Sequence, residues 1–178
     1  YSREGFAQFK SGSTGIGAYN TDGTLKAGAK VFYVTAKTAK TIKTTVAGAG
    51  ECTGIQAICD AYQKGQEKTP IAFRFIGLVK KSELDKVSSS EEGIQIKGKS
   101  AYSDMNITIE GVGDDATVHG FGFLCRNASS VEFRNFAIMR CMDDCISMDT
   151  QNSKIWIHNM DFLYRPNGGG APANGDGT

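Results

Sequence analysis

The residues most able to do chemistry lie in one short acidic stretch, Asp143-Asp144-Cys145-Ile146-Ser147-Met148-Asp149. Adjacent side chains on a regular strand point to opposite faces, but a bend between two strands can turn both Asp143 and Asp144 toward one point. Converging carboxylates repel one another unless a hard cation neutralises them. Ca²⁺ is the usual cation, since it takes roughly six to eight oxygen ligands in flexible geometry. Asp143 and Asp144 are therefore candidate calcium ligands, and a solvated acidic turn is the alternative.

Two cysteines bracket this pair of aspartates. The chain has five in all: Cys52, Cys59, Cys125, Cys141 and Cys145. Their odd number means that at least one thiol is free or has its partner outside this chain. A zinc site is disfavoured, because Cys141 and Cys145 lack the paired short spacing of structural zinc sites and both histidines are distant in sequence. We expect small apolar thiols packed in the interior, with a disulfide as the second possibility.

The elements that must position the acidic stretch show a repeat. Three phrases recur at a constant step, with first positions 106, 130 and 154: Asn106–Ile109, Ser130–Phe133 and Lys154–Ile157. Each alternates apolar and polar side chains, which is typical of a strand with one face in a core and one in water. The repeat predicts an all-β solenoid, a parallel β-helix in which equivalent apolar residues stack as ladders. Unrelated strands of a β-sandwich are the alternative.

A further acidic residue, Asp176, lies in the glycine-rich stretch that closes the chain. It follows Asp144 by more than one step of the repeat, which indicates a loop inserted into the coil that begins at Lys154. Inserted loops on the flank of a solenoid are where binding grooves are built. Asp176 is thus the third candidate calcium ligand, and a frayed polar tail is the alternative.

Other segments fill in the solenoid. Residues 31–35 and 71–77 predict strands, the second ending at Gly77, and residues 54–64 predict a short amphipathic helix suited to cap the first coil. Residues 36–49 have no clear period and receive no assignment. We expect one domain over residues 1–178, with the cap at about 1–70 and the coils at about 71–178.

Composition limits the partners. The 178 residues carry 20 basic and 19 acidic side chains, a net charge of +1, so no basic face points to nucleic acid. Neither a membrane-spanning apolar run nor a leader segment is evident, and we expect no membrane partner.

The sequence resembles the extracellular pectate lyases of polysaccharide lyase family 1, which are right-handed parallel β-helices. Asn106–Gly113 matches the family's "N-x-T-I-x-G-x-G", and Asp144–Ile146 matches its "D-A-I". Gly5–Ala7 and Ser13–Gly17 resemble the family's opening "GFA … TTGG", and Val31–Thr35 resembles the strand that follows it. The helix from Gly54 is similar to the family's capping helix, and Ile155–Ile157 matches the start of "W-I-D-H".

The resemblance implies a role for each matching residue. Asp144 corresponds to a calcium ligand of the family, and Asp143 is a neighbour that could add a second. Asp176-Gly177-Thr178 resembles the start of "D-G-L-x-D", whose first acidic residue also binds calcium. The "W-I-D-H" aspartate is replaced by His158, which we expect to be a packing or surface group. The family's catalytic arginine lies downstream of "D-G-L-x-D", hence beyond Thr178, so we expect an incomplete β-helix and assign no catalytic residue.

The implied function is calcium-assisted β-elimination on de-esterified polygalacturonate by a secreted enzyme. This chain would supply the N-terminal coils and part of the calcium site, and a second polypeptide that carries the remaining coils is a candidate partner. Two alternatives stay open: a non-catalytic carbohydrate-binding β-helix, and a polygalacturonase-type hydrolase, which needs two carboxylates and a water but no calcium.

Overall fold

The computed structural model describes residues 3, 5, 14–87 and 93–163. Among these residues strands dominate, with one α-helix and one short 3₁₀ helix. The elements in chain order are β1 Lys30–Val34, β2 Lys43–Val46, β3 Gly50–Thr53, α2 Ile55–Tyr62, β4 Ile71–Lys80, the 3₁₀ helix Lys81–Glu83, β5 Ile94–Lys97, β6 Ser103–His119, β7 Phe123–Arg126, β8 Ala128–Met139, β9 Ile146–Met148 and β10 Ser153–Leu163.

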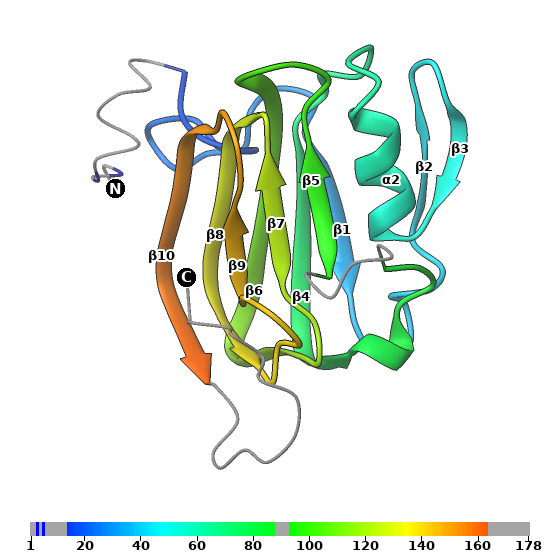
Figure 1. Ribbon diagram of the computed structural model, residues 1–178, viewed down its shortest axis with the longest axis vertical. Coiled ribbons are helices and arrows are strands. Elements are labelled where there is room, and N and C mark those ends of the chain that lie inside the picture. Colours follow the sequence, from blue (N-terminus) through cyan, green and yellow to red (C-terminus); the bar gives the residue numbers. More distant parts are fainter. Residues whose placement is uncertain (1–2, 4, 6–13, 88–92, 164–178) are drawn as a thin grey trace.

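The strands of the described segments form two parallel sheets and one hairpin. The larger sheet has the order β1-β4-β6-β8-β10, and the smaller has the order β5-β7-β9. Figure 1 shows the smaller sheet lying over one face of the larger, with the chain passing alternately between them from β4 to β10. This arrangement is a parallel β-helix, which confirms the predicted fold class.

The sequence repeat sets the register of the larger sheet. Ile107 pairs with Val131 and Val131 with Ile155, while Ile109 pairs with Phe133 and Phe133 with Ile157. In β6 and β8 these side chains are fully buried, whereas in β10, the edge strand, they are half-buried. The predicted apolar ladders are confirmed, and β4 extends them by one coil through Ile71 and Phe73.

Bends in the coils also recur with the repeat. Asn106, Ser130 and Lys154 adopt left-handed backbone conformations, with φ of 55°, 58° and 51°. Asparagine tolerates this conformation better than most residues because its short polar side chain can bond locally. The hydroxyl of Ser130 donates to Asn106 Oδ1 at 3.1 Å, so the stacked bends are also linked to one another.

Helix α2 covers β5, the first strand of the smaller sheet, as expected of a helix that caps the first coil (Figure 1). Its Ile55, Ile58 and Tyr62 are buried in the core. Gln56 pairs with the edge of β5: its amide nitrogen donates to the Gln95 carbonyl at 3.2 Å, and the Gln95 N–H donates to Gln56 Oε1 at 2.8 Å. The helix thereby satisfies backbone groups that an open solenoid would leave exposed.

The structure differs from the sequence prediction in two places. Residues 36–49, left unassigned, contribute β2 to an antiparallel hairpin with β3. The strand expected to end at Gly77 continues to Lys80, so that boundary is wrong. Gly77 has a φ of 63°, and the pairing with β6 shifts register between Ile76 and Leu78. Between these pairs β6 has four residues, 113–116, where β4 has only Gly77, so the extra residues of this irregularity belong to β6 and Gly77 lies opposite them within a longer strand.

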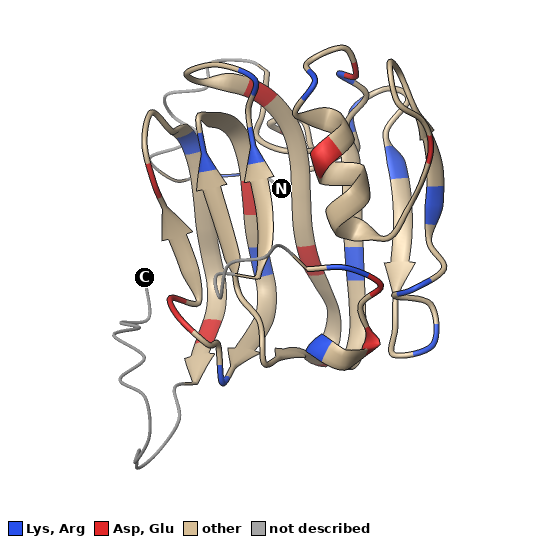
Figure 2. Ribbon diagram, turned by 45° about the vertical axis from the view of Figure 1, so that its right-hand side comes forward, with Lys and Arg blue, Asp and Glu red and all other residues tan. Residues whose placement is uncertain are grey.

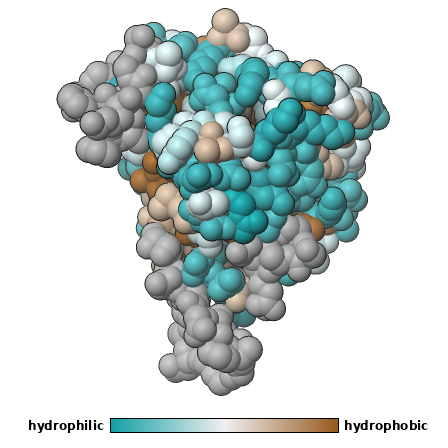
Figure 3. All heavy atoms as spheres, turned by 45° about the horizontal axis from the view of Figure 1, so that its top comes forward, coloured by the Kyte–Doolittle hydropathy of each residue, from teal (hydrophilic) through white to brown (hydrophobic). Residues whose placement is uncertain are grey.

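The surface is polar and mixed in charge. Figure 2 shows basic and acidic residues interspersed over the described helix, hairpin and sheets, and the face in Figure 3 is mostly hydrophilic. No helix among the described residues is long and apolar enough to cross a membrane.

Candidate functional site

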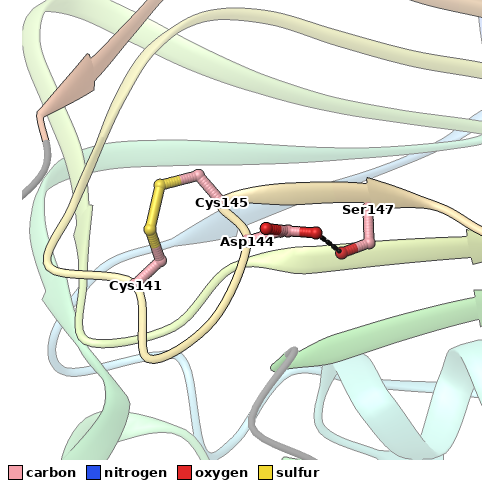
Figure 4. Close-up of a disulfide and its surroundings, with 4 residues drawn as sticks. All are labelled: Cys141, Asp144, Cys145 and Ser147. Carbon is pink, nitrogen blue, oxygen red and sulfur yellow. Dashed lines mark hydrogen bonds between the residues drawn. A yellow bond between two sulfur atoms is a disulfide. The ribbon is translucent and has the colours of Figure 1, made fainter. Parts of the chain in front are cut away.

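The acidic stretch forms a turn between the end of β8 and the start of β9. Asp143 and Asp144 are half-buried there. A disulfide joins Cys141 to Cys145 and closes the turn around them (Figure 4). The preferred expectation of free apolar thiols is therefore wrong for these two residues, and the disulfide, the second possibility, is present. The expectation holds for Cys59 and Cys125, which are free and buried.

The turn is anchored at its C-terminal end. Cys145 is fully buried and its carbonyl accepts a hydrogen bond from the Phe123 N–H at 3.0 Å. Gly122 lies directly beneath: a Cβ added there would come within 2.6 Å of the Asp144 carbonyl oxygen and 2.5 Å of that of Cys145. A side chain at position 122 would push the turn outward, so glycine permits this close approach.

The carboxylate of Asp144 is oriented by its neighbour on β9. Ser147 Oγ donates to Asp144 Oδ2 at 3.1 Å, as the dashed line in Figure 4 marks. Asp149, for which no ligand role is expected, instead accepts from Arg126 Nε at 2.5 Å on the adjacent strand β7. Arg126 neutralises the charge of Asp149, so this carboxylate is paired within the protein and is not counted with Asp143 and Asp144 as a candidate ligand.

The oxygen donors at this turn fit calcium in kind. Carboxylates and a hydroxyl are hard ligands, which Ca²⁺ prefers. The described residues contain no group of three or more His, Cys, Asp or Glu side chains that could hold a metal ion. The acidic groups of the turn that the structure describes are therefore too few to form a complete metal site by themselves. Asp176, the third predicted ligand, lies outside the described residues.

A larger polar cluster, which the sequence reasoning missed, covers the outer face of the five-stranded sheet. We call it the outer-face cluster: Arg3, Tyr19, Tyr33, Arg74, Thr108, Glu110, Glu132, Arg134, Trp156 and His158. Its signal was present in the repeat, because the outward positions 108, 132 and 156, like 110, 134 and 158, share the constant step of the repeat and fall in register.

Glu110 is the first centre of the outer-face cluster. Its carboxylate accepts from Arg74 Nε at 2.8 Å, Arg134 Nη2 at 2.6 Å and the Tyr19 hydroxyl at 2.5 Å. Burial alone raises the pKa of this carboxyl, but the hydrogen bonds from Tyr19 and Arg74 and the charge of Arg134 outweigh it, so the pKa of Glu110 is lowered.

Glu132 is the second centre and is fully buried. It forms an ion pair with Arg3, accepts from Thr108 Oγ1 at 3.0 Å, and lies 2.9 Å from His158 Nε2. His158 stacks on Trp156 with ring centroids 4.0 Å apart. His158 thus packs against Trp156 and contacts Glu132 within the cluster, in agreement with the expected packing role.

The outer-face cluster fastens the N-terminal segment to the sheet. The Ala18 N–H donates to Thr108 Oγ1 at 2.9 Å and the Gly17 N–H donates to Ser130 Oγ at 3.0 Å. A Cβ at Gly17 would lie 2.2 Å from Thr108 Oγ1, so only glycine fits against the sheet here. Because its carboxylates are paired with basic groups and hydrogen-bond donors of the chain itself, the cluster has a structural role: it holds the N-terminal segment against the sheet.

Comparison with known proteins supports the fold. The sequence matches no protein-family model and no curated protein. Among solved structures, the chain is similar to a pectate lyase from Bacillus sp. N165 crystallised with trigalacturonate, with a TM-score of 0.59 and 19% sequence identity. The match covers 92% of this chain and 43% of that one. The chain thus has a pectate-lyase-like β-helix fold and spans less than half the length of that enzyme.

Proposed function

We propose that the chain is the N-terminal part of a calcium-dependent pectate lyase that cleaves de-esterified polygalacturonate by β-elimination. The observation that carries the proposal is the acidic turn: on a pectate-lyase-like β-helix, Asp144 lies just before a short strand, in the motif that resembles the family's "D-A-I". Trigalacturonate bound to the structural neighbour supports the choice of substrate class.

In this proposal Asp144 and Asp143 hold the metal, and Asp176 adds a further ligand. Bound calcium supplies positive charge next to a uronate carboxylate, which makes the neighbouring C5 proton more acidic. Ser147 keeps the Asp144 carboxylate in one orientation through its 3.1 Å hydrogen bond. The chain's own task is to position the substrate's charged groups.

The base is proposed to lie on coils beyond Thr178. Arg126 is committed to Asp149, and Arg134 is committed to Glu110 and Glu132. An arginine already paired with a carboxylate is stabilised in its charged form and is a poor proton acceptor. The Cys141–Cys145 disulfide favours an oxidising compartment, which supports secretion of the whole enzyme.

The test combines metal binding with product detection. Calcium affinity is measured by titration calorimetry on the chain, its Asp144→Asn variant and, as a matched control, Asp115→Asn, which alters an exposed aspartate of β6. We expect Asp144→Asn alone to lose calcium binding. Equal affinity in all three proteins would contradict the assignment of Asp144.

The whole enzyme, with its further coils, is then incubated with polygalacturonate, with calcium or with a chelator. A lyase produces an unsaturated sugar that absorbs in the ultraviolet, and the chelator abolishes it. New reducing ends without that absorbance, unaffected by chelation, would indicate a hydrolase. Binding without either product would indicate a carbohydrate-binding module.

A further inference from the structure

The Cys141–Cys145 disulfide encloses Met142, Asp143 and Asp144, so both described candidate calcium ligands lie inside the bridged turn. Met142 is 46% exposed, whereas Cys141 and Cys145 are 6% and 0% exposed. The two cysteines are therefore buried, and the turn between them, with its half-buried aspartates, is more exposed to solvent. The bridge determines how far apart the ends of the acidic turn can move.

We propose that this disulfide is a positioning device for the calcium site, so that calcium affinity depends on the thiol redox state of the chain. The inference rests on the proposed function, since it concerns the same two aspartates. Without the bridge, the enclosed backbone gains freedom that calcium binding must remove again. Ordering the backbone of even one residue again raises the dissociation constant by about tenfold.

Contacts in the rest of the coil make the effect local. Cys145 stays attached to β7 through the hydrogen bond from the Phe123 N–H, and Ile146 remains fully buried after it. Cys141 lies beyond the end of β8 at Met139, outside the paired strands. Opening the bridge should therefore loosen residues 141–144 and leave the ladders of β6 and β8 intact.

Chemical reduction tests this in the natural sequence. A dithiol reductant transfers two electrons and two protons to the S–S bond, giving two cysteine thiols while the reductant becomes a cyclic disulfide. All five cysteines lie in the described residues and three are free, so thiol titration of denatured samples, which also exposes the buried Cys59 and Cys125, should rise from three to five per chain. This count verifies that the one bridge has opened.

The measurement is calcium titration calorimetry on the oxidised chain, the reduced chain and the chain reoxidised afterwards. We expect reduction to weaken calcium affinity by at least about tenfold and reoxidation to restore it. Circular dichroism should show the same β-sheet signal throughout. Cys141→Ser/Cys145→Ser should reproduce the reduced state, and Cys52→Ser, which removes a thiol from β3, should bind calcium like the original.

Each outcome decides the matter. Equal calcium affinity in the oxidised and reduced chains, with five thiols titrated, would overturn the positioning role while leaving the calcium site intact. No calcium binding by the oxidised chain would overturn the proposed site and this inference together. If reduction abolished the β-sheet signal as well, the disulfide would be a general structural bond and the positioning role would be refuted.

Discussion

The outer-face cluster makes the sharpest prediction about stability. Replacing Glu110 with Gln keeps the size of the side chain and removes its charge. The side chain of Glu110 is 6% exposed, and those of its partners Arg74 and Arg134 are each 25% exposed. Two largely buried guanidinium groups would thus lose the carboxylate they share. The amide can no longer neutralise them, although its oxygen still accepts one hydrogen bond.

The magnitude follows from this burial. Removing one partner of a buried ion pair lowers the free energy of unfolding by about 3–5 kcal/mol, and the residual exposure of both arginines gives Glu110→Gln a loss of about 3 kcal/mol. For a domain of this size that corresponds to a melting temperature lower by about 6–12 °C. The control is Glu51→Gln, whose pair with Lys43 spans 3.3 Å and has both side chains more than 60% exposed. There we expect less than about 1 kcal/mol.

The pH dependence of the same variant tests the cause. The pKa of Glu110 is lowered from its ordinary value of 4.5 in the folded chain, so the folded state binds this proton less readily than the unfolded state. The stabilisation is complete above the unfolded value and is lost as pH falls through the folded pKa. The gap between the original chain and Glu110→Gln should be widest near neutral pH and narrow below about pH 4.5.

The assay is urea unfolding of all three proteins, followed by circular dichroism at several pH values. Equal destabilisation by Glu110→Gln and Glu51→Gln would refute the assignment of Glu110 as a buried electrostatic centre. A gap that stayed constant from neutral to acidic pH would show that the loss came from packing rather than from charge.

Further predictions concern the core and the acidic turn. Val131→Asp buries an unpaired charge in the ladder, so its β-sheet circular dichroism should be lost, while Val112→Asp, at a 39% exposed position of β6, should stay folded. Folded Val131→Asp would contradict the inward register. Gly122→Ala should destabilise by about 1–3 kcal/mol and weaken calcium binding, because its Cβ meets the turn's carbonyl oxygens; unchanged melting and affinity would disprove that contact. Under the proposed function, Asp144→Ala should raise the calcium concentration needed for lyase activity of the protein with its further coils, and an unchanged calcium dependence would exclude Asp144 as a ligand.

Much of the fold could be predicted because it is repetitive. A side chain that recurs once in every repeat stacks on its equivalent one coil away, so alternation within a strand and spacing between strands define the same ladder. The helix at Ile55–Tyr62 was also predictable from its three- and four-residue apolar spacing. The hairpin of β2 and β3 was not, since Lys43–Val46 is short and polar and is a strand only because β3 folds back on it.

The candidate site divides in the same way. From the sequence alone, Asp143 and Asp144 are candidate calcium ligands because they are adjacent acidic residues and because Asp144 matches the motif "D-A-I". It could not decide between free thiols and a bridge, because pairing depends on the distance between Cys141 and Cys145 in the folded chain. The role of Asp176 as a calcium ligand stays a prediction, because this residue lies outside the described part of the chain.

The residue types and the constant step of the repeat determined a parallel β-helix with an acidic turn, since backbone pairing and apolar burial follow from local pattern. Only the tertiary structure decided which charges meet. Glu110 accepts hydrogen bonds from Arg74 of the preceding coil, from Arg134 of the next coil and from Tyr19 of the N-terminal segment. Tyr19 and Glu110 are 91 positions apart, and Arg3 and Glu132 are 129 apart. Such contacts depend on how the coils and the N-terminal segment pack, which no local pattern specifies.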